Sequence, residues 1–281
     1  MQLRNSAAEL FIPGGGDADA ALARTTDLCF GAHQDDIEIM AYGPIVQCYD
    51  DSARAFTGVT VTDGAGSPRS GLYAGYTDDD MKIVRAEEQK QAAVIGRYGA
   101  QFLLAYRSGE VKAADNAALV DELAEIVLRC APEVVYTHNF ADKHDTHVAV
   151  ALNVVRALRK IPAEKRPKKV ISMEVWRCLD WLCDGDKAVF DTGAHANLAA
   201  ALLGVYDSQI TGGKRYDLAT VGRRLANATF FASHDVDECE SVSFGLDITE
   251  LVEKDFTPAE FINGYIDKFR DEVNERIAKL A

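Results

Sequence analysis

Three neighbouring segments near the N-terminus constrain the fold more than any other part of the chain. The apolar stretch Asp27–Ala32 stops at a polar cluster, which is typical of a buried strand, and the β-branched stretch Phe56–Thr62 predicts a second strand. Between them, Ile37–Cys48 is apolar and contains Gly43-Pro44, which predicts an interrupted helix. Strand, helix and strand in such close succession form a βαβ unit, so the sheet must contain parallel strands.

The alternation of strands and helices continues through the middle of the chain. We expect helices at Asp80–Tyr98, Ala117–Arg129 and Asp145–Lys160, and strands at Glu133–Thr137 and Lys169–Trp176. This order predicts an α/β fold with a mainly parallel sheet and helices on both faces. The C-terminal third is mostly helical by pattern, and its last helix begins at a capping box, Thr257–Glu260.

No internal repeat or low-complexity linker divides the chain, so we expect residues 1–281 to form a single domain. Residues 1–26 contain the run Gly14–Gly16 and are expected to be a loose leading segment. A long loop rich in Gly, Ser and Thr, Asp63–Thr77, follows the second strand and is expected on the substrate side of the sheet.

Composition excludes several classes of partner. The formal net charge is −14, and an acidic surface repels both nucleic-acid phosphates and anionic membranes. No apolar run is long enough to span a membrane, and the N-terminus lacks a signal-peptide pattern, so we expect a cytoplasmic protein. The six cysteines form no CxxC pair and are expected to be reduced. The sequence is compatible with a homo-oligomer.

The segment that follows the first predicted strand carries the most chemistry. It reads His33-Gln34-Asp35-Asp36, and a strand that ends there delivers these side chains to the carboxyl edge of the sheet, where ligands bind in open α/β folds. A catalytic zinc needs three protein ligands and one open position. His33 and Asp36 supply two ligands, and Asp35 remains free to act as the base that takes a proton from water.

A second cluster follows the strand Glu133–Thr137 and should lie at the same edge. His144 and His147 stand three residues apart at the start of the helix Asp145–Lys160. His147 directly precedes the apolar face of that helix and is predicted to be the third metal ligand. His144 is then available to stabilise the oxyanion or to donate a proton to the leaving amine. His138 could face the same cleft or serve as a structural hydrogen-bonding residue.

These segments together resemble the PIG-L/LmbE-like N-acetylglucosaminyl deacetylase family. Residues 32–38 resemble its AHPDDE signature, and His144–His147 resembles its HPDH motif. Further landmarks occur in the family's order at residues 59–64, 85–88 and 206–209. The resemblance covers roughly residues 27–245.

The resemblance implies a Rossmann-like fold and a zinc-dependent enzyme that removes acetyl from an N-acetylated sugar or small glycoconjugate. By position, His33, Asp36 and His147 match the family's metal ligands, Asp35 its general base, and His144 the histidine that stabilises the transition state. Arg85 matches a helix position associated with substrate binding. Arg69, in the long loop, is a second candidate for contact with an anionic group of the substrate.

Two departures from the family pattern bear on activity. Gln34 replaces the proline of the first motif, which should loosen the turn without removing a ligand. In the second motif, Thr146 occupies the place of the aspartate that would orient the catalytic histidine, and either Asp142 or Asp145 could substitute. Two alternatives therefore stay open: a metal-dependent hydrolase of another acyl substrate, and a carbohydrate-binding or sensing protein with a degenerate metal site. Other divalent metals could replace zinc in a His₂Asp site.

Overall fold

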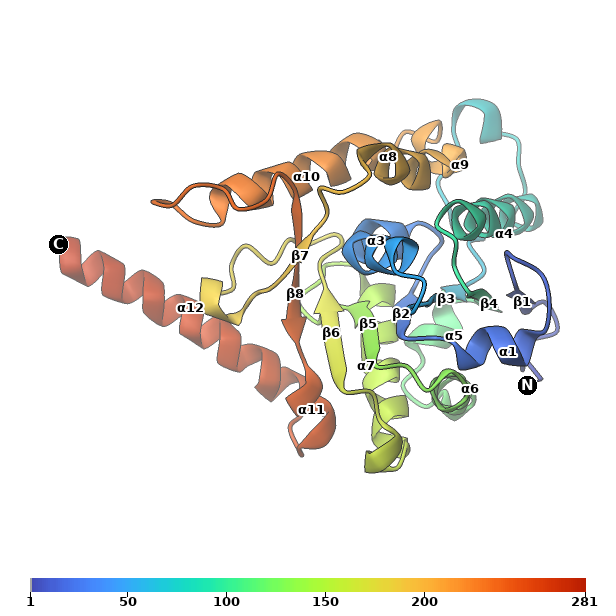
Figure 1. Ribbon diagram of the computed structural model, residues 1–281, viewed down its shortest axis with the longest axis horizontal. Coiled ribbons are helices and arrows are strands. Elements are labelled where there is room, and N and C mark those ends of the chain that lie inside the picture. Colours follow the sequence, from blue (N-terminus) through green and yellow to red (C-terminus); the bar gives the residue numbers. More distant parts are fainter. Residues whose placement is uncertain (1) are drawn as a thin grey trace.

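The computed structural model describes residues 2–281 and contains one eight-stranded sheet, in the order β1-β4-β3-β2-β5-β6-β8-β7 (Figure 1). The strands are β1 (Glu9–Phe11), β2 (Asp27–Gly31), β3 (Phe56–Thr62), β4 (Ala100–Tyr106), β5 (Val134–His138), β6 (Lys169–Met173), β7 (Ala188–Asp191) and β8 (Val242–Asp247). The five central strands of the sheet, in the order β4-β3-β2-β5-β6, pair in parallel. Antiparallel strands complete both sides, with β1 at one edge and β8 and β7 at the other.

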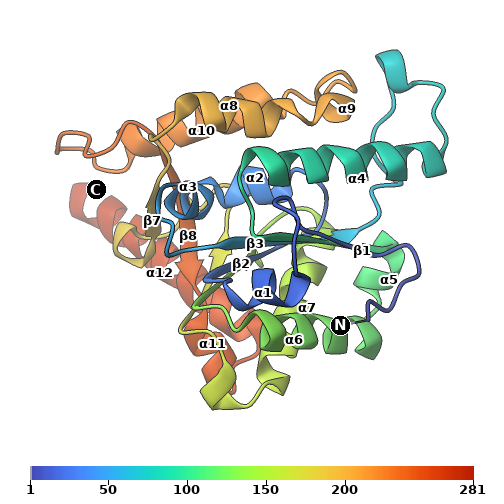
Figure 2. The ribbon, with the colours of Figure 1, turned by 45° about the vertical axis from the view of Figure 1, so that its right-hand side comes forward.

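Helices cover both faces of this sheet (Figure 2). On one face lie α2 (Asp36–Met40), α3 (Tyr42–Asp50), α4 (Asp78–Ile95), α8 (Ala196–Gly204), α9 (Asp207–Ile210) and α10 (Tyr216–Phe230). The other helices are α1 (Ala18–Ala23), α5 (Ser108–Lys112), α6 (Ala117–Cys130), α7 (Asp145–Lys160), α11 (Thr249–Glu253) and α12 (Pro258–Leu280). Short 3₁₀ turns occur at η1 (Gly71–Tyr73), η2 (Ala163–Lys165) and η3 (Asp184–Asp186).

Two apolar cores form where the sheet meets its helices. Along β2, Leu28 and Phe30 pack with the residues of α6 and α7, whereas Cys29 between them belongs to the core beneath α2 and α3. Successive side chains of a strand point to opposite faces, so a strand buried on both sides reads as a continuous apolar run. The predicted α/β fold with a mainly parallel sheet and helices on both faces is confirmed.

The interrupted helix divides at a different residue from the one expected. The break falls at Ala41, which ends α2 and precedes α3, and Pro44 lies within the first turn of α3. Proline has no N–H to donate, and the first turn of a helix is the place where none is needed. The chain therefore begins a new helix just before the proline instead of ending one at it.

The sequence pattern does not predict the strands in three parts of the sheet. Strand β4 consists mostly of Ala, Gln and Leu, which favour helix, yet it pairs between β3 and β1 and is buried along most of its length. The C-terminal region is mainly helical, as expected, but also supplies β7 and β8, which are short and carry Ser, Gly and Asp. Residues 1–26, expected to be a loose segment, contain β1 and α1.

Candidate active site

The site lies at the carboxyl ends of β2 and β5, which are neighbours in the sheet. From β2 the chain crosses to β3 on one side, and β5 leads on to β6 on the other, so the direction of the strand order reverses here. Open α/β sheets bind ligands at such a switch point. The two motifs identified in the sequence follow these two strands, and the fold brings them together.

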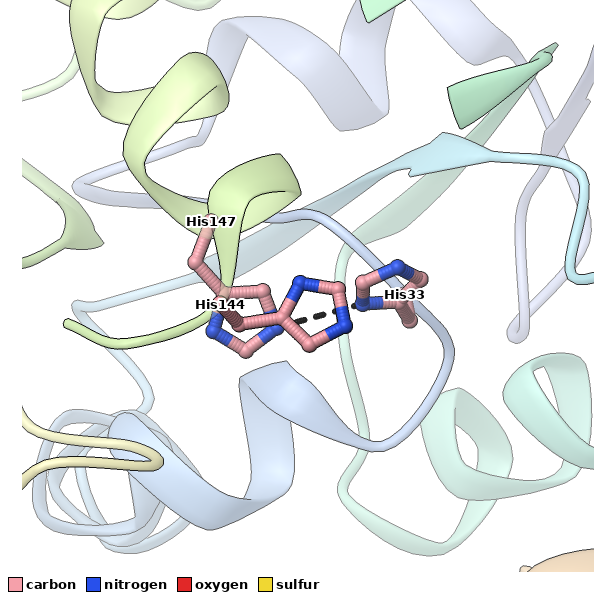
Figure 3. Close-up of side chains that lie close together, drawn as sticks. All are labelled: His33, His144 and His147. Atoms are coloured by element: carbon pink, nitrogen blue, oxygen red, sulfur yellow. Dashed lines mark hydrogen bonds between the residues drawn. The ribbon is translucent and has the colours of Figure 1, made fainter. Parts of the chain in front are cut away.

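Three donor atoms converge at the bottom of the site. His33 Nδ1 lies 3.2 Å from Asp36 Oδ2 and 3.2 Å from His147 Nε2, and Figure 3 shows the two imidazoles facing each other. His147 Nε2 lies 3.3 Å from Asp36 Oδ2. These atoms come from the β2–α2 loop, the first residue of α2 and the first turn of α7.

The protonation states of this donor set suit a metal ion. Burial lowers the pKa of His147 to about 4, so its ring is neutral at pH 7. Burial opposes ionisation of Asp36, but the imidazoles of His147 and His138 outweigh it and hold its pKa well below the ordinary value. Two imidazoles and a carboxylate form a three-ligand set of the kind that a catalytic zinc uses. The residues therefore fit the metal that the sequence implies.

His138 approaches the same atoms but has another partner. Its Nε2 lies 3.4 Å from Asp36 Oδ2, and it accepts a 2.8 Å hydrogen bond from the Ala32 N–H. An imidazole nitrogen that accepts from an amide has no free lone pair for a metal. The ring also stacks on that of His147, with centroids 4.0 Å apart. His138 is thus a structural residue that fixes the end of β2 and one face of His147.

Asp35 stands beside the donor set in an unusual backbone conformation. Its φ is 98°, a region that residues other than glycine rarely adopt, and such strain is concentrated at functional sites. Its carboxylate lines the cleft and accepts a 3.0 Å hydrogen bond from Arg85 Nη2. Burial raises the pKa of Asp35 to about 7, although the Arg85 charge acts in the opposite direction. A pKa near 7 suits a group that takes and returns a proton.

The two arginines predicted to contact substrate have different environments. Arg85 in α4 is buried, and besides Asp35 it donates to the Gln34 carbonyl, to Glu88 and to Ser208. This arginine therefore connects α4 and α9 to the Asp35 loop. Arg69 pairs with Asp78 at the start of α4 and donates to the Ala65 carbonyl. It is not one of the residues lining the cleft, so the structure does not bring it to the site.

His144 lies at the cleft wall, immediately before α7. Its ring stacks on His147 with centroids 4.5 Å apart and meets the His33 ring edge-on at 4.8 Å (Figure 3). Burial, together with the charge of His33, lowers the pKa of His144 below its ordinary value. Its Nδ1 is buried and has no hydrogen-bond partner among residues 2–281.

Asp142, not Asp145, is the carboxylate associated with the second motif. Its Oδ1 accepts the His144 backbone N–H at 2.9 Å, and its Oδ2 lies 3.4 Å from His147 Nδ1. Asp145 is exposed on the first turn of α7. Asp142 thus orients the ring of His147 and the backbone of His144, whereas the His144 ring has no carboxylate partner within the described part of the chain.

A cleft of about 660 Å³ opens above these residues. It is lined by His33, Asp35, Asp36 and His144. It is also lined by residues that belong to neither motif, among them Trp176, Lys214, Tyr216 and Arg223. These additional residues come from the segment after β6, from the loop before α10 and from α10 itself, far along the chain from either motif. No spacing or periodicity could have related them to the motifs.

The region that carries both motifs matches a known protein family. Residues 28–158 match the PIG-L family, described as GlcNAc-PI de-N-acetylase. The two sequence motifs thus lie in a region that matches the PIG-L family. No curated protein sequence matches it.

Several solved structures share the fold of this protein. The N,N′-diacetylchitobiose deacetylase of Pyrococcus horikoshii superposes with a TM-score of 0.64 and 14% identity, over 82% of this chain and 86% of that one. A conserved protein of Thermus thermophilus gives 0.63 and 17%, over 79% and 94%. GalB, the 4-carboxy-2-hydroxymuconate hydratase of Pseudomonas putida, gives 0.60 and 17%, over 80% and 96%. At these identities the similarity is one of fold alone, and proteins with different named activities share this fold.

Within residues 2–281, none of the helices combines the length and apolar character needed to cross a bilayer.

Proposed function

We propose that this protein is a zinc-dependent hydrolase that removes the N-acetyl group from an amino sugar or a small glycoconjugate. The observation that carries the proposal is the convergence of His33, Asp36 and His147 beside Asp35 at the bottom of an open cleft. The description of the family as a de-N-acetylase and the name of the Pyrococcus horikoshii deacetylase support an N-acetylated sugar as substrate. The proposal treats residues 2–281 as one catalytic domain, because α10 and both motifs line the same cleft.

His33, Asp36 and His147 would hold the metal. When bound, a zinc ion supplies a Lewis acid that polarises the acetyl carbonyl and lowers the pKa of water. Asp142 contributes by fixing the ring of His147, since a ligating histidine is normally oriented through its other nitrogen.

Asp35 is the proposed general base and acid. Its carboxylate takes a proton from the attacking water and returns it to the amine as the C–N bond breaks. Arg85 orients this carboxylate through its 3.0 Å hydrogen bond, and the contacts of Arg85 with Glu88 and Ser208 keep the guanidinium in place. Asp35 has a positive φ and lines the cleft.

His144 is the proposed stabiliser of the acetyl oxygen as negative charge develops there. A neutral imidazole can donate only one N–H, and the unpartnered Nδ1 leaves the tautomer free to place that proton where the oxyanion forms. This role uses His144 as a hydrogen-bond donor, whereas Asp35 carries the transferred proton.

Acetate release tests the proposal directly. We would incubate metal-stripped and zinc-reconstituted protein with N-acetylglucosamine and several N-acetylated glycoconjugates and measure the acetate formed. Zinc-dependent release is the expected result. Sugar binding without release would instead favour a binding or sensing role, which agrees with the absence of a carboxylate at the His144 ring within residues 2–281. Release only from other acyl compounds would favour a hydrolase of different substrate class.

A further inference from the structure

Six lysine and arginine side chains line the cleft in a chain whose net charge is −14, and four of them are not buried. These four residues, the basic rim, are Lys112, Lys143, Lys214 and Arg223. None forms an ion pair with a carboxylate of residues 2–281, and the three lysines are exposed. Basic residues that collect in one cleft of an acidic protein without carboxylate partners produce a local positive potential, which attracts anions.

The carboxylates of the same cleft form no ion pair with this rim within residues 2–281. Asp35 is paired with Arg85, and Asp36 belongs to the metal-ligand set. Glu174 accepts hydrogen bonds from Asn227 Nδ2 at 2.6 Å, from the Phe244 N–H at 3.1 Å and from the Leu179 N–H at 3.0 Å. Each acidic group thus has other partners, although Glu174 lies close enough to Arg223 for their charges to interact. The three lysines remain available to an incoming ligand.

Three members of the rim converge on the segment that follows β6. Arg223 donates to the Val175 carbonyl, and Lys214 Nζ lies 5.1 Å from the centre of the Trp176 ring. Lys143 follows Asp142, whose carboxylate accepts the Trp176 N–H at 3.1 Å. The charges of Lys214 and Arg223 thus lie beside one short stretch of backbone, and Lys143 follows the residue that holds this stretch.

This stretch adjoins the reacting centre. The Trp176 ring lies 6.3 Å from that of His144, with an interplanar angle of 29°. Tyr216 meets Trp176 edge-on at 5.9 Å, so the two rings provide an apolar surface between His144 and the basic side chains. Aromatic side chains of this kind offer a face to a ring and a polar tip to water.

We infer that the substrate carries an oxyanion, either a phosphate or a carboxylate, which Lys143, Lys214 and Arg223 bind while the sugar ring lies against Trp176. The inference rests on the proposed function for the position of the acetamide, and it adds the chemical class of the rest of the molecule. Lysines provide mobile point charges, whereas Arg223 provides a planar donor that is already oriented by the Val175 carbonyl. Neutral N-acetylated sugars then bind weakly because they leave the basic rim unpaired.

Binding to the metal-free protein tests the rim separately from catalysis, and it avoids phosphate binding to zinc. We would titrate N-acetylglucosamine, N-acetylglucosamine 1-phosphate and N-acetylmuramic acid calorimetrically. At least one anionic sugar should bind about tenfold more tightly than the neutral sugar, since charge-assisted hydrogen bonds exceed neutral ones in strength. This preference should decrease as salt is added. The two anionic sugars distinguish phosphate from carboxylate recognition.

Substitutions then assign the preference to the rim. Lys143→Gln and Lys214→Gln change exposed side chains, so folding should be preserved, and each should reduce the ratio of anionic to neutral affinity severalfold. Lys165→Gln, an exposed lysine outside the cleft, is the matched control for loss of one positive charge. Equal affinity for neutral and anionic sugars would overturn the inference. So would an unchanged preference in the double variant of Lys143 and Lys214.

The two proposals fail in different ways. Loss of anion preference in the rim variants, combined with no acetate release from any substrate, would leave the anion site standing and refute the deacetylase. Zinc-dependent release at the same kcat/KM from neutral and anionic sugars would leave the deacetylase standing and refute the anion site.

Discussion

Asp142 shows how a single carboxylate can position several groups of this site. One oxygen receives the His144 N–H, and the other faces His147 Nδ1 and the Trp176 N–H. It therefore fixes a proposed metal ligand, the start of α7 and one wall of the cleft. Asp35, by contrast, has one side-chain partner, Arg85, and lines the cleft.

Replacement of Asp142 should weaken metal binding. Asp142→Asn leaves the shape of the side chain but removes the charge that orients the His147 ring, and loss of such a partner typically lowers metal affinity about 10–100-fold. Competition with a chromophoric chelator measures the zinc affinity. Asp145→Asn, which changes an exposed carboxylate three residues away, should bind zinc as the wild type does. Equal affinity in the two variants would contradict the role given to Asp142.

Replacement of Asp35 should separate turnover from metal binding. Asp35→Asn removes the proton acceptor and keeps the three ligands, so we expect zinc to be retained and kcat to fall about 10²–10⁴-fold. Zinc content and acetate release from the best substrate provide the two readouts, with Asp145→Asn again as the control. Normal turnover in Asp35→Asn would show that another group moves the proton.

Substitutions should show that His33 is a metal ligand and that His138 has a structural role. His33→Ala removes a donor atom and should abolish stoichiometric zinc binding. His138→Gln keeps an acceptor for the Ala32 N–H and should retain one zinc per chain, because His138 Nε2 is already occupied by that amide. Metal analysis after gel filtration distinguishes the variants. Loss of zinc from folded His138→Gln would instead place His138 among the ligands.

At the scale of elements, the loop after β3 and helix α4 are packed closely against the first motif. Gly64 has a φ of +75°, and a Cβ there would approach Gln34 Oε1 at 2.7 Å and Arg85 Cβ at 2.9 Å. The loop can therefore pass over α4 only with glycine at this position. Its far end is joined to α9 by the Tyr73 hydroxyl, which donates to Asp207 at 2.8 Å.

A pair of glycine substitutions tests this packing. Gly64→Ala should destabilise the protein by about 1–3 kcal/mol, through the unfavourable φ and the overpacking, and should also lower kcat by displacing Arg85 from Asp35. Gly66 lines the same cleft, and a Cβ there would meet no atom within 4 Å, so the stability of Gly66→Ala should be close to that of the wild type. Chemical denaturation and acetate release compare the two. Similar stability for both variants would argue against the close packing at Gly64.

At the scale of the whole molecule, the site joins the two halves of the sheet. Its ligands come from segments after β2 and β5, and the cleft above them is completed by α10 from the C-terminal region. A bound metal would therefore crosslink parts of the fold that are distant in sequence. Native-state binding of this kind adds to the free energy of unfolding.

Removal of the metal should lower thermal stability. With zinc at about 100 times its Kd, binding contributes about 2.7 kcal/mol to the free energy of unfolding. For a chain of this size, that corresponds to a Tm about 5–10 °C higher than in chelator-treated protein. Thermal scans with and without zinc measure the difference, and His33→Ala should show little of it. An equal zinc response in His33→Ala would mean that the stabilising ion binds elsewhere.

The sequence by itself determined the α/β class and the meeting of the two motifs, because both depend on local patterns. Apolar runs such as Asp27–Ala32 and Phe56–Thr62 predict buried strands, and parallel strands place their carboxyl ends at one edge. His33, Asp36 and His147 could be expected together on that basis, and the structure places them within contact. Their roles as metal ligands stay predictions.

Only the tertiary structure decided the details that depend on long-range packing. Most residues of β4 favour a helix, but this segment forms a strand because it is buried between β3 and β1 in the sheet. Asp142 could not be chosen over Asp145 from spacing, because the turn before α7 directs one inward and leaves the other exposed. The basic rim and Trp176 have no signature of their own. They become neighbours only because the segment after β6 and helix α10 fold back over the switch point, and side-chain proximity across such distances is set by packing, not by sequence periodicity.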